Sequence, residues 1–454
     1  MQITEVNRYK SPKLLLSNLV FYNIVLCMEL KYEYYPRIVD SLLQDKLKSA
    51  GAVLIEGTKW CGKSTTAERF AGSAVYLQNT DTRTQNIELA KNAPSLFLKG
   101  ATPKMIDEWQ IIPFIWDQIR FEVDHRHLKG QFILTGSATP VDEDSYEHSG
   151  IGRIVPMIMR PMSLFESRDG NGLVSLDVLF NHPEDFEASE CSLGLEDYAY
   201  LLCRGGWPST LGLPRKEALD QVYNFYDGLV YTDINKVFKR TKNPERIKRL
   251  LRSYSRAIST DMSNAMIRDD VLANDEKTFD DDTVVSYLNA LSKLFVVEEL
   301  PAWNTNLRSK TAIRTSNTRH FVDPSIACAS LGVGPDDMIN DLETFGLWFE
   351  SMCIRDLRIY SQRLDGQIYH YRDSKGREAD AIIHLRNGKW AAVEVKLSSQ
   401  ESIDDGAGHL LGLAADIDTS RHAAPSFLMV LTTTPYAYRR GDGVYVVPLG
   451  CLRD

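Results

Sequence analysis

Residues 57–64 carry the sequence Gly57-Thr58-Lys59-Trp60-Cys61-Gly62-Lys63-Ser64, and the fold of the first part of the chain depends on it. An apolar run at 52–55 precedes this stretch and helix-forming residues follow it, so the local pattern is strand, glycine-rich turn and helix. In such a P-loop the peptide N–H groups curl around phosphate oxygens, and the positive end of the helix dipole points at the same place. Lys63 is expected to reach the β- and γ-phosphates, and the Ser64 hydroxyl to ligate Mg²⁺. The expected nucleotide-binding residues are this stretch and Thr65.

Length and composition limit the kind of protein. A chain of 454 residues predicts about three domains, and 43% hydrophobic with 25% charged residues is typical of globular proteins. The net charge of -9 argues against indiscriminate coating of nucleic acid or anionic membrane. The seven cysteines include no C-x-x-C pair, which favours a reduced, cytoplasmic setting without a disulfide framework or zinc site. Cys61 is interpreted as a small filler of the loop.

The first 27 residues have an ambiguous pattern. An apolar run at 14–28 follows Lys10 and Lys13, which weakly resembles a signal peptide. The run lacks a clear cleavage site and is too short to span a membrane, so no membrane partner is expected. A second interpretation is that translation starts at Met28. Residues 1–27 are therefore treated as a leader or a misassigned start.

A second chemical motif follows a short apolar strand. Residues 103–108 end in Asp107 and Glu108, the Walker B arrangement, in which Asp107 would hold Mg²⁺ through water and Glu108 would polarise the attacking water. Residues 131–137 predict another strand, and Ser137 at its end would sense the γ-phosphate, with an ordinary turn serine as the alternative. The carboxyl ends of parallel strands meet at one edge of a sheet. We therefore expect Lys63, Asp107, Glu108 and Ser137 to lie together.

Arg153 is the candidate arginine for stabilising the transition-state charge of phosphoryl transfer. The sequence leaves open whether it would act on its own nucleotide or on that of a neighbour in a homo-oligomer. An ordinary surface arginine is the alternative.

These motifs stand in an order that resembles a known family. Residues 57–64, 107–110, 132–137, 152–153 and 161–166 look like the prokaryotic AAA-type ATP-binding proteins that carry a C-terminal domain of unknown function 4143. Residues 205–208, Gly-Gly-Trp-Pro, resemble the Gly-Gly-aromatic-Pro element of that family. The resemblance covers the chain from about residue 35 nearly to its end. It implies ATP binding, and it leaves the biological role unassigned.

The middle of the chain predicts helices and then a winged-helix module. Residues 178–213 are irregular in pattern, and helices are expected over 215–240, 244–258, 263–273 and 282–294, followed by a β-hairpin formed by 295–300 and 313–322. The wing would offer Arg308, Lys310, Arg314 and Arg319 to DNA, but the third helix begins at three aspartates, 280–282, which repel phosphates. We expect a lever or protein contact, with base readout as the alternative.

The C-terminal part brings carboxylates together. A turn at 387–388 predicts a hairpin that places Asp380 near Glu394, with Lys396 two residues further on. Such a set suits Mg²⁺-dependent water attack on a phosphodiester. The pattern looks like a PD-(D/E)xK nuclease core with Glu350 as the helix acid, although residues 378–380 lack the proline. The alternative is an inherited fold in which Glu394 and Lys396 form a structural ion pair.

Together these patterns predict an α/β chain with five parts: the leader at 1–27, an AAA-type P-loop ATPase domain at 28–170, a helical connecting region at 171–243, a winged-helix module at 244–330 and a restriction-endonuclease-like domain at 331–454. The expected function is ATP binding with Mg²⁺-dependent hydrolysis that drives a conformational switch. The alternative is an ATP-gated nuclease or another ATPase that acts on DNA. Partner candidates besides ATP are DNA, a protein, or a second copy of the chain.

Overall fold

The computed structural model describes residues 33–137, 150–238, 242–272, 280–303, 316–373, 377–417 and 423–454. The predicted leader therefore lies outside the described residues, as do Arg308, Lys310 and Arg314 of the wing. By its internal contacts the chain from Arg37 to Asp454 forms one compact unit. No helix of the described residues is long and apolar enough to cross a bilayer.

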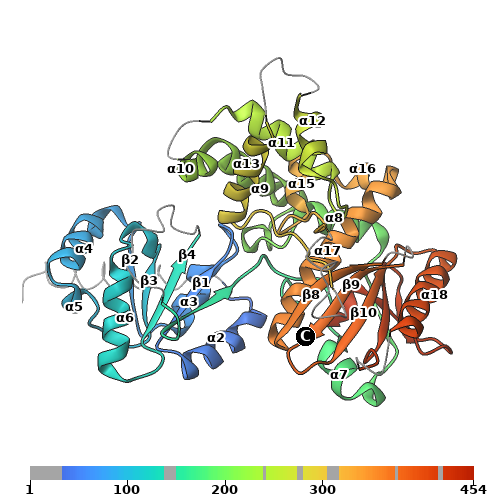
Figure 1. Cartoon of the computed structure of the whole chain (residues 1–454), viewed down its shortest axis with the longest axis horizontal. Helices are drawn as coiled ribbons and strands as arrows, with labels where there is room; N and C mark the ends of the chain where they lie inside the picture. Colours follow the sequence, from blue (N-terminus) through green and yellow to red (C-terminus); the bar gives the residue numbers. More distant parts are fainter. Residues whose placement is uncertain are drawn as a thin grey trace, which may run out of the picture. The chain divides into compact units, whose positions relative to one another are not determined.

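The N-terminal part of this unit is a five-stranded parallel sheet in the order β2-β3-β4-β1-β5 (Figure 1). Successive side chains of a strand point to opposite faces of a sheet. In β1, Ala52 and Leu54 accordingly pack with α4, α5 and α6, whereas Val53 and Ile55 pack with α2 and α3. Its elements are α2 (Ile38–Ser49), β1 (Ala52–Glu56), α3 (Lys63–Phe70), β2 (Ser73–Tyr76), α4 (Thr80–Asn92), α5 (Pro94–Phe97), β3 (Lys104–Asp107), η1 (Trp109–Ile111), α6 (Ile115–Arg126), β4 (Phe132–Gly136) and β5 (Ile154–Ile158).

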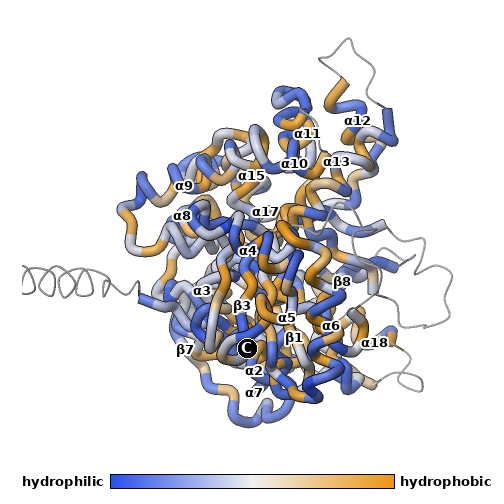
Figure 2. Tube along the Cα trace, turned by 90° about the vertical axis from the view of Figure 1, so that its left-hand side faces the viewer, coloured by the Kyte–Doolittle hydropathy of each residue, from blue (hydrophilic) through white to orange (hydrophobic). Residues whose placement is uncertain are grey.

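A largely helical region follows, and its helices alternate hydrophilic and hydrophobic positions along their length (Figure 2). The helix α8 lies in a stretch for which the sequence predicted no regular structure; it forms because Tyr198, Leu201 and Leu202 bury one of its faces. The elements are α8 (Leu195–Arg204), η4 (Pro208–Thr210), α9 (Arg215–Gly228), the π-helical turn η5 (Leu229–Asp233), α10 (Ile234–Phe238), α11 (Pro244–Arg256), α12 (Asn264–Leu272), α13 (Asp281–Lys293), α15 (Ser325–Leu331) and α16 (Pro335–Asn340).

The segments expected to form the winged-helix module are three helices, α11 to α13, and a pair of antiparallel bridges, Val297 with Phe321 and Leu300 with Thr318. The side chain of Asp280 caps α13 through the Thr283 N–H (2.8 Å), as expected of an acid at a helix start. The expected role of Arg319 in the wing needs correction. Its guanidinium donates to Met262 O (3.1 Å) and Asn264 Oδ1 (2.8 Å) and contacts Glu299, so internal partners occupy it.

The C-terminal part is built on a mixed seven-stranded sheet in the order β7-β12-β13-β11-β10-β9-β8. The buried helix α17 covers one face and α18 the other, so the strands between them are apolar on both sides. The elements are α17 (Leu342–Arg363), β8 (Gly366–Arg372), β9 (Glu378–Leu385), β10 (Trp390–Val395), α18 (Gln400–Asp416), β11 (Leu428–Thr432), β12 (Tyr436–Arg439), β13 (Tyr445–Pro448), η6 (Leu449–Cys451) and β14 (Leu452–Arg453).

The region expected to be one helical connection, 171–243, divides in two. Its first elements are β6 (Val174–Ser175), α7 (Leu176–Asn181), η3 (Pro183–Asp185) and β7 (Ser189–Glu190). The strand β7 pairs with β12 at the edge of the C-terminal sheet, and β6 pairs with β14. Phe180 packs on Phe427 with ring centroids 4.9 Å apart. This segment therefore belongs to the C-terminal part, because its backbone completes strands that lie more than 200 residues further along the chain.

Candidate functional site

The glycine-rich loop connects β1 to α3 and packs against the segment that follows β5. A Cβ atom on Gly57 would come within 2.0 Å of Met159 O, and the φ of Gly57 is 153°, so only glycine fits there. Gly62, with φ 100°, is the residue before α3. The Cys61 thiol is buried and donates to Met159 O at 3.4 Å, consistent with its interpretation as a filler. Sequence spacing and tertiary packing therefore agree on the path of this loop.

Lys63 is the buried first residue of α3, directly after the loop. Its Nζ donates to Gly57 O (2.9 Å) and Thr58 O (2.7 Å), so the ammonium group is held among the loop carbonyls. Thr58 Oγ1 is buried and has no hydrogen-bond partner in the described part of the chain. Thr65, in contrast, is exposed on the first turn of α3. A cation and an unpaired buried hydroxyl in one cradle fit an oxygen-rich anion such as a phosphate.

Asp107 is the centre of a buried polar cluster. Its carboxylate accepts hydrogen bonds from Ser64 Oγ (2.7 Å), Thr135 Oγ1 (2.6 Å) and Gln78 Nε2 (2.9 Å). The two residues expected to hold Mg²⁺, Ser64 and Asp107, thus touch each other directly. The local sequence pattern did not single out Thr135 and Gln78. Thr135 lies near the end of β4 and Gln78 lies two residues after β2, and these positions beside β3 could have indicated them.

Glu108 and Ser137 also meet, as expected from their places after β3 and β4. Ser137 Oγ donates to the Glu108 carboxylate, 3.2 Å from each oxygen, and Gln110 Nε2 contacts the same carboxylate. Glu108 has a φ of 55°, a left-handed conformation that is uncommon for a residue with a side chain. This conformation turns the chain at the end of β3.

Arg153 is not brought to this cluster. It precedes β5, and its carbonyl accepts the N–H of Ala52 at the start of β1, whereas the loop follows the end of β1. Its Nε pairs with Asp124 Oδ1 at 2.9 Å in an exposed position. Because β1 and β5 are parallel, Arg153 lies one strand length away, roughly 16 Å, from the loop end of the sheet. Action of Arg153 on its own chain's nucleotide is therefore not supported.

A buried ion pair that the sequence did not indicate anchors the loop. Arg37 Nη1 donates to Cys61 O at 2.7 Å, and Arg37 Nε lies 3.1 Å from Glu166 Oε1. The same carboxylate accepts the N–H groups of Ile38 (2.8 Å) and Ser163 (2.9 Å). Glu166 belongs to the motif at 161–166. The sequence therefore indicated the motif but not the structural role of its glutamate.

The loop also contacts the helical region. The Lys59 ammonium pairs with Asp233, and Trp60 packs edge-on against Phe225 with ring centroids 5.8 Å apart. Nothing in the local sequence pattern pointed to either contact, because the partners are more than 160 residues away.

The four candidate nuclease residues gather at the end of β10. Lys396 Nζ lies 2.9 Å from Glu394 Oε1, and the N–H of Val395 donates to Asp380 Oδ2 at 2.7 Å. Glu394 Oε2 is buried without a partner in the described residues, and His409 Nδ1 of α18 lies 3.5 Å from Glu394 Oε1. Among the described residues no three His, Cys, Asp or Glu side chains are arranged to hold a metal ion.

Burial shapes the protonation of these acids. Burial and the nearby Glu394 raise the pKa of Asp380 to about 7. Burial and repulsion from Asp380 raise the pKa of Glu350 well above its usual value. Burial also raises the pKa of Glu394, although contact with Lys396 opposes the rise. Three carboxyl groups in one desolvated place, with Lys396 as one nearby cation, would share protons unless a further cation were bound.

Comparisons with protein families agree with the predicted resemblance. Residues 49–167 match a family model described as AAA domain, and residues 345–452 match the Domain of unknown function (DUF4143). Residues 195–337 match a further model, Domain of unknown function (DUF8612). No curated protein shows significant similarity to the chain. The chain is thus similar to AAA-type ATPases with a C-terminal domain of unknown function 4143, as its motifs predicted.

Proposed function

We propose that this chain binds ATP and hydrolyses it with Mg²⁺, and that hydrolysis moves the helical region against the loop. One observation carries the proposal: Lys63, Ser64, Asp107, Glu108 and Ser137 converge at the carboxyl ends of β1, β3 and β4. Lys63 would bind the β- and γ-phosphates. Glu108 would orient and polarise the attacking water, and Ser137 would hold the Glu108 carboxylate in place.

The residues present fit Mg²⁺. Ser64 Oγ and Asp107 Oδ1 lie 2.7 Å apart and would serve as oxygen ligands, and Thr135 and Gln78 fix the orientation of the Asp107 carboxylate. When bound, Mg²⁺ would neutralise charge on the phosphates. Arg153 would take part only through a second copy of the chain, since its own site lies at the other end of the sheet.

Equilibrium ATP binding and steady-state ATP turnover by the full chain test the proposal. We expect Lys63→Ala to weaken ATP binding about tenfold or more, because charge-assisted bonds to phosphate are lost. We expect Glu108→Gln to keep ATP binding and to lower turnover about 100-fold or more. Lys91→Ala and Glu88→Gln on the exposed side of α4 are matched controls. Wild-type binding that Lys63→Ala leaves unchanged, or full turnover in Glu108→Gln, would contradict the proposal.

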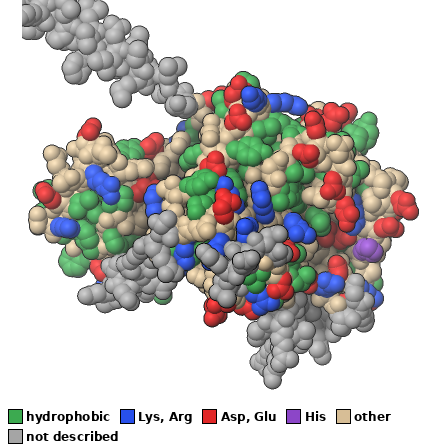
Figure 3. Space-filling view, turned by 90° about the horizontal axis from the view of Figure 1, so that it is seen from above, with side chains coloured by type: hydrophobic (Ala, Val, Ile, Leu, Met, Phe, Trp, Pro, Cys, Tyr) green, Lys and Arg blue, Asp and Glu red, His purple; other side chains and the backbone are tan. Residues whose placement is uncertain are grey.

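A second candidate function is Mg²⁺-dependent cleavage of DNA gated by ATP. The gathering of Glu350, Asp380, Glu394 and Lys396, with an unpaired buried oxygen on Glu394, favours it. The alternative is that Glu394 and Lys396 form only a structural ion pair. On the face shown in Figure 3, Lys and Arg side chains are interspersed with Asp and Glu, which favours a protein partner over indiscriminate DNA binding.

Incubation of the full chain with DNA, ATP and Mg²⁺ or Mn²⁺ separates these candidates. The nuclease candidate predicts DNA cleavage that Asp380→Ala abolishes while ATP turnover is retained. Asp405→Ala, an exposed position on α18, is the control. Absence of cleavage by the wild type, together with ATP turnover indifferent to DNA, would leave the nucleotide switch with a protein partner as the function.

A further inference from the structure

The P-loop contains a second lysine, and an acid of the helical region holds it. Lys59 lies between Thr58 and Gly62 and pairs with Asp233, while Lys63 bonds to the carbonyls of Gly57 and Thr58. The Asp233 side chain is only 14% exposed, and that of Lys59 is 37% exposed. A mostly buried carboxylate is therefore paired with a side chain of the loop that would bind a polyphosphate.

The position of Asp233 makes this contact a connection between two parts of the chain. Asp233 is the last residue of the π-helical turn η5, which joins α9 to α10, and such turns are frequent at functional sites. Lys236 Nζ also lies 3.7 Å from Asp233 Oδ1. Asp233 would thus keep a counter-ion if Lys59 moved away.

The neighbouring loop residues reach the same region. Trp60 contacts Phe225 of α9, and Phe225 packs on the buried Trp207 with ring centroids 4.3 Å apart. Pro208 lies 3.6 Å from the position of a Cβ atom on Gly62. Loop positions 59, 60 and 62 are therefore all in contact with, or next to, residues between 207 and 233.

We propose that Lys59 is a second phosphate-binding lysine that Asp233 holds in reserve, and that a bound nucleoside triphosphate draws it off Asp233. The inference rests on the proposed ATP binding. Lysine carries a compact charge on a flexible stem, so a short rotation transfers it between two anions. A triphosphate has one more phosphate group than a diphosphate and competes better for Lys59. Release of Asp233 would then report the triphosphate to η5 and the helices beside it.

Isothermal titration of ATP and ADP in the Glu108→Gln background tests this inference without turnover. We expect Asp233→Asn to tighten ATP binding about fivefold or more and ADP binding less. Lys59→Met should weaken ATP binding by a similar factor, and Asp233→Asn should have no effect on affinity when Lys59→Met is present. Asp227→Asn, exposed on α9, is the matched control.

Three outcomes would overturn it. Asp233→Asn could weaken ATP binding, it could act equally on ATP and ADP, or its effect could persist with Lys59→Met. Each of these outcomes would mean that the ion pair is only structural.

Hydrogen exchange provides a check that does not depend on variants of Asp233. ATP should speed exchange of the backbone N–H groups at 229–238 in Glu108→Gln, but not when Lys59→Met is added. Absence of ATP binding that depends on Lys63 would overturn the proposed function as well, whereas such binding without an effect of Asp233→Asn would overturn this inference alone.

Discussion

Asp380 illustrates how one buried side chain makes stability depend on pH. Its pKa rises from 3.8 to about 7 on folding, because of burial and the nearby Glu394. Between these values the folded state binds more protons than the unfolded state, so the contribution of Asp380 to stability is greatest below about pH 4, falls as pH rises and levels off above about pH 7. The loss above pH 7 amounts to at most about 4 kcal/mol.

Asp380→Asn should remove much of this loss. We expect the variant to be more stable than the wild type at pH 8 and nearly equal to it at pH 4, as measured by urea unfolding at both values. Asp405→Asn should leave the pH dependence unchanged. An Asp380→Asn chain with the same dependence of stability on pH as the wild type would show that the titration of Asp380 does not cause this dependence. Its neighbours Glu350 and Glu394 would then account for the dependence.

The Gly-Gly-Trp-Pro element at 205–208 shows what a short connection contributes. A Cβ atom on Gly206 would come within 2.0 Å of Met162 O, and the N–H of Gly206 donates to Asp323 Oδ2 at 2.9 Å. The ring N–H of Trp207 donates to Ser325 Oγ at 2.9 Å. The element therefore holds the end of α8 against Met162, which follows β5, and against the start of α15.

Gly206→Ala should destabilise the chain by about 1–3 kcal/mol, because the methyl group overlaps backbone atoms that cannot move freely. Urea unfolding measures the change. Gly228→Ala is the matched control: its position on α9 has helical dihedral angles and open space around it. Loss of glycine there should stabilise the helix by up to about 1 kcal/mol. Equal effects of the two changes would contradict the close packing at Gly206.

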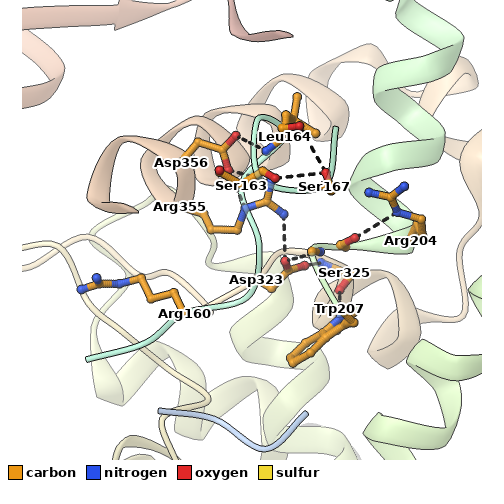
Figure 4. A network of polar contacts seen from close by, with 12 residues as sticks. Arg160, Ser163, Leu164, Ser167, Arg204, Trp207, Asp323, Ser325, Arg355 and Asp356 are labelled. Carbon is orange, nitrogen blue, oxygen red and sulfur yellow. Dashed lines mark hydrogen bonds and ion pairs between the residues drawn. The ribbon is translucent and has the colours of Figure 1, made fainter. Parts of the chain in front are cut away.

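A buried ionic network joins distant parts of the compact unit (Figure 4). Arg355 of α17 lies 2.8 Å from Asp323 Oδ2 and 2.7 Å from Asp356 Oδ1, and all three side chains are almost fully buried. The N–H of Leu164, near the end of the AAA-like part, donates to Asp356 Oδ2 at 3.0 Å. One network therefore contacts the motif at 161–166, the Gly-Gly-Trp-Pro element and α17.

This arrangement predicts that the ATP site and the C-terminal sheet unfold together. ATP at about 100 times its Kd should raise the free energy of unfolding of the wild type by about 2.7 kcal/mol. The free energy of opening that hydrogen exchange reports in β9 and β10 should rise by the same amount. Asp323→Asn leaves Arg355 with one buried partner and should remove the ATP effect on β9 and β10. Asp336→Asn, exposed on α16, should keep it. Retention of the ATP effect on β9 and β10 in Asp323→Asn would show that other contacts connect the two parts.

The sequence by itself determined the loop at 57–64 and the parallel strands around it, because strand, turn and helix signals act over a few residues. It also determined the placement of Asp107, Glu108 and Ser137, because the carboxyl ends of parallel strands lie at one edge of the sheet. Only the tertiary structure showed that Arg153 lies at the far end of the sheet and that residues 174–190 belong to the C-terminal part. It also showed that Arg37 pairs with Glu166 and Lys59 with Asp233. The partners in these two ion pairs lie 129 and 174 residues apart. Such contacts depend on the path of the whole chain, which no local pattern encodes.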